Sequence, residues 1–477
     1  MSYNNPSSLL QLAIQSLLRD DNLTITSLKH LPAEVFPSLF LEAHIHRRRE
    51  TLKALVQTWP FERLPLGALL QDGQPEDPRF KAVMDGIDVL LKQEVPHRCK
   101  LRVLDLQFTG QKFWRMWTGV DLPVFSERRK LVDEGPSRNK KAKPYFEVCV
   151  DLYISRNHAD RLSNYLLDWI RERKGVHLSC KTVMIYSLTR KSFRFLHAMP
   201  FCDIKELGIH CTLTFSTLRL LGIQLGMMNN LKRLDVCIDI LAATTPEEDD
   251  WMPVCISEFT SAFHQLLHLQ ELYLKSPFFL QGHLHQLIRV TEGDLTHLFQ
   301  SPHITHLKDL CLRGLPLTSV SEPLRALLEV NAATLQHLDL GLCGLQDPQL
   351  EALLPALSSC SQLSSLSLHG NRLSMATLEK LLRCTSGLSR LRQEIYPAPM
   401  ETFNPQGILQ PQTFDLLCTH IFKILKELKH SRSIVVSTGR CSYCARKMFR
   451  NWKLIILPCL SCFRDYKKLS FRPTGSE

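Results

Sequence analysis

The sequence predicts an α/β fold, namely a leucine-rich-repeat solenoid of the ribonuclease-inhibitor type with an N-terminal helical cap. Residues 335–345 and 363–373 both match the signature LxxLxLxx(N/C)xL, with Leu338 and Leu366 at equivalent positions one repeat apart. The segments between such frames repeat leucines at helical spacing, as in 350–357 and 378–382. One strand and one helix per repeat predict a horseshoe with a parallel inner sheet and outer helices.

Residues 1–96 are expected to form the helical cap. Apolar side chains follow one helical face from residue 9 to residue 18, and this helix is expected to end near Asp20. A second helical unit is expected at residues 31–40, and a third from Arg47 to Trp59. Pro60 ends the third helix, because a residue before proline disfavours the α region.

The repeat domain is expected to span residues 97–395. Its first LxxLxL frame is 101–106, and strand-like runs at 145–154 and 176–185 flank a helix expected at 159–172. The steps between later frames are nearly equal, except that the steps from 234 to 272 and from 272 to 310 are longer and contain insertions. The central residues of these frames are Leu207, Leu234, Leu272, Leu310, Leu338, Leu366 and, in a degraded copy, Leu391.

Cys343 and Asn371 occupy the N/C position of their repeats. A short polar side chain at this position can bond to the backbone as the chain leaves the strand. We interpret both residues as structural, and no reactivity is expected of Cys343.

Residues 126–144 interrupt the repeats with a polar, basic, turn-rich loop. Two interpretations remain open for this loop: a solvated surface insertion, or a two-part nuclear-import signal. The basic side chains concerned are Arg128, Arg129, Lys130, Lys140, Lys141 and Lys143.

Beyond the repeats we expect a cap helix within residues 396–439 and a basic, cysteine-containing tail at 440–477. The tail holds two CxxC pairs on either side of segment 445–458, Cys441 with Cys444 and Cys459 with Cys462. Four thiolates at such spacing can hold a structural zinc, although the spacing falls just short of the common zinc frame. The alternative is four ordinary thiols.

Composition argues against several functional classes. Hydrophobic residues make up 44% of the 477 residues, and the net charge is +11. The basic residues are widely spread, so direct nucleic-acid binding is not expected. The sequence opens without a basic segment followed by an apolar core, so a secretory leader is not expected. It contains no apolar run near the ~18 residues of a membrane span. Its 16 cysteines are therefore expected to be reduced thiols in the cytoplasm or nucleus.

Enzymatic activity is not expected of this chain. The sequence lacks GxSxG, P-loop and GxGxxG motifs, and its 20 glycines provide little material for phosphate-binding loops. No cofactor is required, and the candidate zinc would be structural.

The N-terminal segments closely resemble the PRAME family. The residues concerned are 8–20 (SLLQLAIQSLLRD), 31–40 (LPAEVFPSLF), 51–61 (TLKALVQTWPF) and 64–67 (LPLG). The resemblance continues at 101–106, at 335–345 and at the C-terminal cysteine pairs, so it spans nearly the whole chain. Among the members, the chain resembles germline-expressed rodent paralogues most.

This resemblance implies a substrate-recognition subunit of a cullin–RING ubiquitin ligase. In the family an N-terminal helical box docks on the elongin adaptor of the cullin scaffold, and the solenoid presents protein substrates. Docking requires a leucine followed by a small residue, often cysteine, on one helical face, and this segment offers Leu9 with Ala13 or Leu10 with Ile14. Residues 31–34 (LPAE) also resemble the start of an F-box, another ligase-adaptor motif. The implied docking residues are Leu9, Leu10, Leu12, Ala13, Leu17, Leu31, Pro32 and Phe36.

Members are also described as repressors of retinoic-acid-receptor transcription that affect proliferation, differentiation and apoptosis. A nuclear repressor that binds transcription factors or nuclear receptors is therefore one alternative, and a non-catalytic scaffold or inhibitor is another. The LxxLL strings at 66–70, 350–354 and 378–382 fit the first alternative, but burial in the solenoid also explains them. In every case the exposed strand positions should determine the partner, and we expect Gln336, His337, Asp339, Ser364, Ser365 and Ser367 to do so.

Overall fold

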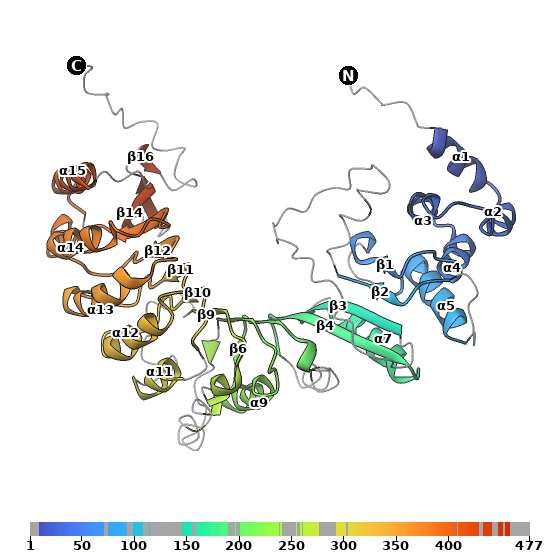
Figure 1. Ribbon diagram of the computed structural model, residues 1–477, viewed down its shortest axis with the longest axis horizontal. Coiled ribbons are helices and arrows are strands. Elements are labelled where there is room, and N and C mark those ends of the chain that lie inside the picture. The colour runs from blue at the N-terminus through green and yellow to red at the C-terminus, as the bar shows by residue number, and fades with distance from the viewer. Residues whose placement is uncertain are drawn as a thin grey trace. The chain divides into compact units, whose positions relative to one another are not determined.

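The chain divides into two compact units, residues Met1–Asp203 and Ile204–Glu477, which are described separately below. Among the described helices, none combines the length and the apolar content needed to cross a membrane. The computed structural model (Figure 1) describes residues 9–70, 75–92, 99–107, 114, 146–154, 159–188, 196, 201–237, 239–240, 254, 258–259, 261–275, 292–301, 304–407, 409–428, 433–440, 447–451 and 454–457.

The first unit begins with the expected helical region. Its helices are α1 (Leu9–Leu17), α2 (Asp21–Ser27), α3 (Val35–Ile45), α4 (Arg49–Gln57) and α5 (Pro78–Lys92). The break near Asp20 starts a new helix, because the Asp20 carboxylate accepts hydrogen bonds from the N–H groups of Asn22 and Leu23 and so caps α2. Helix α3 is buried on most of its surface, and Phe40 stacks on Trp114 with ring centroids 5.6 Å apart.

The sheet of the first unit is parallel. Its strands are β1 (Arg63–Pro65), β2 (Val103–Asp105), β3 (Phe146–Ile154) and β4 (Val176–Ile185), with η1 (Gly67–Leu69) after β1, α7 (Ala159–Arg171) between β3 and β4, and η3 (Phe201–Asp203) at the end. Leu64, Leu104, Val148 and Leu178 pair in register across the four strands, and all four are buried. The strands predicted at 101–106, 145–154 and 176–185 and the helix between them are therefore confirmed.

The second unit contains the clearest repeats. Its parallel strands, in spatial order, are β5 (Glu206–Ile209), β7 (Arg233–Cys237), β9 (Glu271–Lys275), β10 (Asp309–Cys311), β11 (His337–Asp339), β12 (Ser365–Ser367), β13 (Gln393–Pro397) and β14 (Ser433–Arg440). Strands β15 (Lys447–Asn451) and β16 (Leu454–Leu457) follow β14 in antiparallel pairing. A separate parallel pair is formed by β6 (Thr212–Leu213) and β8 (Asp239–Ile240).

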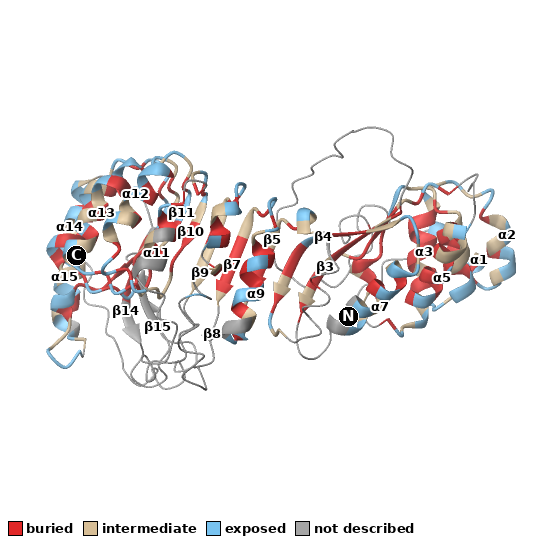
Figure 2. Ribbon diagram, turned by 90° about the horizontal axis from the view of Figure 1, so that it is seen from below, coloured by how far each residue is buried: buried red, intermediate tan, exposed pale blue. Residues whose placement is uncertain are grey.

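Helices connect these strands, and consecutive helices contact each other from α11 to α15 along one face of the sheet (Figure 1). We call the opposite face the inner face. The elements are α9 (Phe215–Leu225), η4 (Ala262–Gln265), α11 (Glu292–Phe299), α12 (Ser321–Val330), α13 (Asp347–Ser359), α14 (Met375–Thr385), η6 (Met400–Thr402) and α15 (Pro411–Glu427). Figure 2 shows buried residues on strands and helices alike, as expected when each repeat hides its leucines against its neighbours.

The leucine frame predicted from the sequence sets the strand register. Leu272, Leu310, Leu338 and Leu366 pair in line across β9 to β12, and each is at most 2% exposed. Burial of each such side chain contributes about 1.5–3 kcal/mol. The predicted leucine-rich-repeat fold is confirmed.

Asn371 and Cys343 have the structural role predicted for their repeat position. The side-chain amide of Asn371 donates to the carbonyl oxygens of Leu340 and Leu368, and its oxygen accepts from the N–H groups of Cys343 and Leu345. The Cys343 thiol lies 3.0 Å from the carbonyl oxygen of Leu312. These side chains satisfy backbone groups where the chain leaves the sheet.

The frame predicted for the last repeat, with Leu391 at its centre, is misplaced along the chain. Glu394, not Leu391, pairs with Leu366, so the step from 366 to 394 equals the step from 338 to 366. Leu391 fills the first leucine position, and Glu394 and Tyr396 fill the next two, with 1% and 2% exposure. A pattern based on leucine misses this repeat because a glutamate and a tyrosine replace two leucines.

Strand pairing also extends past both ends of the range 97–395. Strand β1 pairs with β2, within the region predicted to be only a helical cap. Strand β14 pairs in parallel with β13 and lies beyond α15, so the parallel sheet continues through the predicted C-terminal cap.

Candidate functional site

Helix α1 presents an apolar stripe that contains the first predicted docking residues. Leu9 is 86% exposed, Leu12 is 51% exposed, and Ala13 is also exposed. These residues follow the i, i+3, i+4 spacing of one helical face. The opposite face is anchored through Ile14 and Leu18, at 1% and 3% exposure, and α1 contacts α3. Helix α1 is thus packed against α3 on one face and exposes the apolar stripe on the other.

The remaining predicted docking residues are distributed differently. Leu10 is 44% exposed, Leu17 and Leu31 are half-buried, and Pro32 is exposed. Phe36 is only 3% exposed, and its ring meets Trp59 edge to face at a centroid distance of 6.3 Å. Phe36 therefore belongs to the core of the first unit, and the surface on α1 consists of Leu9, Leu10, Leu12 and Ala13.

The predicted recognition residues lie on β11 and β12 or directly before them. His337 pairs with Ser365, and Asp339 pairs with Ser367. Gln336 and His337 are exposed, whereas Asp339, Ser364 and Ser365 are half-buried.

Ser367 differs from the expectation of an exposed side chain, since it is 6% exposed. Its hydroxyl lies 2.9 Å from Nδ1 of His369, which is also buried. Gly341 leaves room for this imidazole, because a Cβ at Gly341 would collide with the imidazole Cε1. The Ser367 hydroxyl is thus buried and already has a hydrogen-bond partner, so it contributes little to the exposed recognition surface.

The inner face of the second unit also carries an aromatic and charged cluster around Tyr273 that the sequence analysis did not find. The Tyr273 hydroxyl lies 2.9 Å from Asp309 Oδ2. The Arg233 guanidinium and the Lys275 ammonium lie 4.7 and 5.0 Å from the centre of the tyrosine ring. Burial, followed by the charge of Asp309, raises the pKa of Tyr273, so the phenol stays protonated.

Three cations of this face are bonded to carboxylates. Arg233 bonds to Glu271 at 2.8 Å, and Lys275 bonds to Asp235 at 3.1 Å. Farther along the sheet, Arg313 Nε bonds to Asp339 at 3.0 Å. None of these pairs is visible in the sequence, because the partners are 26 to 40 residues apart and meet only through the strand register.

The thiols of Cys311, on β10, and of Cys343, which follows β11, are not activated. Burial raises the pKa of Cys343 to about 12 and that of Cys311 to about 11. Such thiols remain protonated at neutral pH and are poor nucleophiles.

The predicted zinc ligands Cys441, Cys444, Cys459 and Cys462 lie outside the described residues, and so does the basic loop 126–144. Within the described ranges, no group of three or more His, Cys, Asp or Glu side chains is arranged to hold a metal ion.

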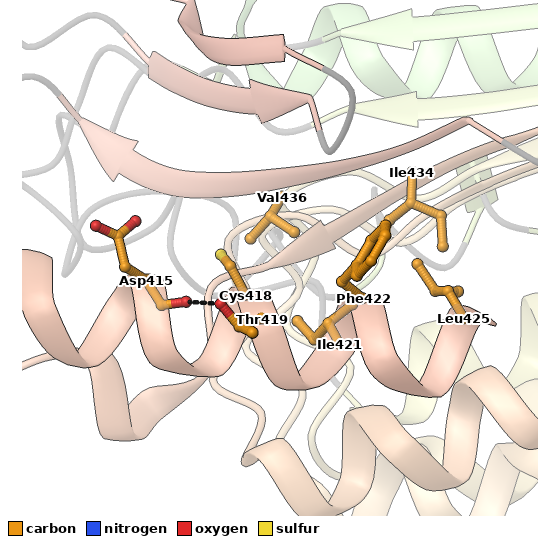
Figure 3. Close-up of a pocket in the computed structure, with 8 residues that line it drawn as sticks. All are labelled: Asp415, Cys418, Thr419, Ile421, Phe422, Leu425, Ile434 and Val436. Atoms are coloured by element: carbon orange, nitrogen blue, oxygen red, sulfur yellow. Dashed lines mark hydrogen bonds between the residues drawn. The ribbon is translucent and has the colours of Figure 1, made fainter. Parts of the chain in front are cut away.

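A small cavity of about 230 Å³ lies between α15 and β14 (Figure 3). Its lining is mostly apolar, with Phe422, Leu425 and Ile434 among the side chains that surround it. Thr419 is tied to the helix backbone, because its hydroxyl donates to the Asp415 carbonyl oxygen at 2.9 Å. The polar part of the lining also includes Asp415 and Cys418 of the same helix.

Two family models match the chain in succession. The PRAME N-terminal domain matches residues 6–114, and the PRAME C-terminal domain matches residues 146–460. The chain belongs to the PRAME family. The predicted resemblance is thereby confirmed, and it covers both helix α1 and the repeats.

Human members of the PRAME family are similar over nearly their whole length. PRAME family member 7 from Homo sapiens is 41% identical over 465 residues, which cover 93% of this chain and 97% of that relative. PRAME family member 20 from Homo sapiens is 38% identical over 471 residues, which cover 94% and 98%. Two Listeria monocytogenes internalins of known structure are also similar. Internalin InlF matches 53% of this chain and 80% of its own, at 13% identity and a TM-score of 0.26. Internalin C2 matches 50% of this chain and 66% of its own, at 15% identity and a TM-score of 0.18.

The ranges matched by the two PRAME domains can be compared with the positions of the basic loop and of the C-terminal cysteines. The basic loop 126–144 falls between the matched ranges, which end at 114 and resume at 146. The C-terminal match ends at 460, so it includes Cys441, Cys444 and Cys459 but not Cys462.

Proposed function

We propose that this chain is the substrate-recognition subunit of an elongin-type cullin–RING ubiquitin ligase. The outward stripe of Leu9, Leu12 and Ala13 on α1 is the observation that supports this proposal most directly. Exposed leucines at helical spacing are the type of surface that an adaptor groove buries. A leucine with a small residue four positions later is also the pattern that the family's docking helix requires.

The two units would divide the work. The first unit would bind the elongin adaptor and, through it, the cullin scaffold. The second unit would hold a protein substrate on its inner face, where Tyr273, Arg233 and His337 provide side chains suited to a protein interface. Tyrosine and arginine are among the residue types that contribute most of the binding energy at such interfaces. Ubiquitination of that substrate would then produce effects on transcription, proliferation, differentiation and apoptosis.

Point variants test adaptor docking better than truncation does. Removal of residues 1–70 would also delete β1 and the buried Trp59, so the first unit would lose part of its core. We therefore choose Leu9→Gln with Leu12→Gln, whose side chains lie outside the core. Leu416→Gln on α15 is a matched control, because Leu416 is 71% exposed.

The measurement is affinity capture of elongin and cullin subunits by the tagged full chain. Each leucine buried in an adaptor groove would contribute about 1.5–3 kcal/mol, so the double variant should reduce capture by more than about tenfold. Leu416→Gln should capture as much as the unaltered chain. Undiminished capture by the double variant, or no capture by the unaltered chain, would refute adaptor docking through α1.

The alternative of a nuclear-receptor corepressor draws no support from the LxxLL strings. Leu66, Leu350, Leu353, Leu378 and Leu382 are each at most 1% exposed. The strings contribute to the core, as the sequence analysis allowed. Cytoplasmic and nuclear residence is proposed for the ligase, with loop 126–144 as the candidate import signal.

A further inference from the structure

One row of side chains crosses the inner face at the start of the strands in the second unit. It consists of the first variable residue of each LxxLxL frame, and we call it the basic row: Lys205, Lys232, Gln270, Lys308, Gln336, Ser364 and Arg392.

The backbone places these seven residues at equivalent positions. The Lys232 carbonyl oxygen accepts from the N–H groups of Gln270 and Glu271, at 2.8 and 3.0 Å. The Lys308 carbonyl oxygen accepts from Gln336 and His337 in the same way, at 2.7 and 2.9 Å. Each row member except the last accepts such a pair from the following strand. The row is therefore fixed in register, and its spacing is the strand spacing of about 4.8 Å.

The row is enriched in positive charge. Four of its seven members are Lys or Arg and none is acidic, whereas Lys and Arg together account for 58 of the 477 residues of the chain. Lys308 and Arg392 are exposed, and neither forms an ion pair with any residue that the structure describes. Lys205 and Lys232 are half-buried.

Three other cations of the inner face differ from Lys308 and Arg392 in this respect. Arg233, Lys275 and Arg313 each bond to a carboxylate of a neighbouring strand. Their charge is largely used within the protein, so attraction for an incoming anion is strongest at Lys308 and Arg392.

We propose that the basic row binds an acidic, extended segment of a partner protein that lies across the strands. This deepens the proposed function, on which it rests, by naming the class of substrate segment. Six strand steps span about 29 Å, which an extended peptide covers with about nine residues. Asp or Glu side chains would pair with the row cations, and Gln270, Gln336 and Ser364 would bond to the peptide backbone between them.

The composition of the row favours a peptide over a nucleic acid. Surfaces that bind single-stranded nucleic acid interleave cations with aromatic side chains on which bases stack. All three uncharged members of the row are instead hydrogen-bonding amides or a hydroxyl.

The probe for this site is a fluorescein-labelled peptide of alternating Glu and Ser that is long enough to cross all seven row positions. The peptide is titrated with the full chain at low ionic strength, and binding is followed by fluorescence anisotropy. Lys308→Gln with Arg392→Gln should raise the Kd about five- to tenfold, because two unscreened contacts are lost. Lys423→Gln with Lys426→Gln is the matched control, since both lysines are exposed on α15 and the loss of net charge is the same. This control should change the Kd by less than about twofold. A peptide with Gln in place of Glu should not bind measurably.

Other outcomes would overturn the inference. An equal loss of peptide affinity in the row variant and in the α15 control variant would show that binding responds to net charge alone. Tighter binding of a single-stranded DNA of similar length, abolished by the same row variants, would assign the row to nucleic acid. Elongin capture is also measured on the Lys308→Gln, Arg392→Gln double variant. If this variant binds the acidic peptide as tightly as the unaltered chain and still captures elongin, peptide binding by the basic row is refuted and the ligase proposal stands. Conversely, lost capture by the α1 variant would not affect the peptide readout.

Discussion

Tyr396 donates a hydrogen bond to the carboxylate of Glu394 inside the core of the last leucine-rich repeat. Glu394 occupies the position that Leu366 fills in the preceding repeat, and it is only 1% exposed. A carboxylate in a leucine position loses hydration that only hydrogen bonds can replace. The tyrosine is one such donor, and the pair forms a polar element in an otherwise apolar array.

Removal of one partner of this pair should cost more than removal of both. Tyr396→Phe should lower the free energy of unfolding by about 1–3 kcal/mol, because the buried Glu394 carboxylate loses the tyrosine hydroxyl as a donor. Glu394→Leu with Tyr396→Phe restores the repeat pattern and should be close to neutral or stabilising. Urea unfolding followed by circular dichroism measures both. A double variant that is less stable than Tyr396→Phe would contradict this account.

Leu338 and Leu366 should each be essential to the repeat core. Replacement of either by Ala should lower the free energy of unfolding by about 2–5 kcal/mol, since each is at most 1% exposed and leaves a cavity. Leu416→Ala, at a 71% exposed site, is the control in the same urea experiment. A loss below about 0.5 kcal/mol at Leu338 or Leu366 would show that these leucines do not carry the core.

His44 should make the first unit less stable in mild acid. Burial, followed by the charge of Arg79, lowers its pKa from 6.5 to about 4. The unfolded chain therefore binds a proton between these two values that the folded chain excludes. The stability due to neutral His44 is complete above pH 6.5 and is lost as the pH falls toward 4. His44→Gln should flatten the dependence of Tm on pH in this window, and an unchanged slope would rule out His44 as its source.

The C-terminal cysteines are predicted to bind one zinc ion. Cys441, Cys444, Cys459 and Cys462 would form a closed four-thiolate site that stabilises the tail. Elemental analysis should find one zinc per chain, and Cys441→Ser with Cys444→Ser should remove it. A zinc-free protein whose tail still resists proteolysis would identify the four residues as ordinary thiols.

The basic loop is predicted to direct nuclear entry. Replacement of its basic residues by Ala should shift a tagged chain toward the cytoplasm, because import signals act through clustered positive charge. The residues to replace are Arg128, Arg129, Lys130, Lys140, Lys141 and Lys143. An unaltered distribution in imaged cells would support a solvated insertion instead.

The repeats were predictable because leucine recurs at nearly constant steps, and the roles of Cys343 and Asn371 followed from their position in the frame. Strands β1 and β14 were not predictable from that frame. Leu64 lies in a very short strand, and β14 reads Ile434 and Val436 where leucines would be expected. Their pairing depends on neighbouring strands that the local sequence does not reveal.

The candidate surfaces were predictable only in part. Exposure of Leu9 and Ala13 on one helical face follows from their spacing, whereas burial of Phe36 depends on its contact with Trp59, which lies beyond the next helix in the sequence. The cluster at Tyr273 depends on which side chains the strand register brings together, and the position of His369 beside Ser367 depends on the room left by Gly341 of the preceding repeat. Local patterns carry no information about such contacts.

The equal steps from Leu310 to Leu338, Leu366 and Glu394 have a consequence for how related genes diversify. An exchange between two paralogous genes at equivalent points of a repeat transfers whole modules without moving the backbone register. The leucines remain interchangeable, while the variable residues of the strands arrive in new combinations. Recombination alone can therefore generate new inner-face surfaces in this family while the folded core is retained at every step.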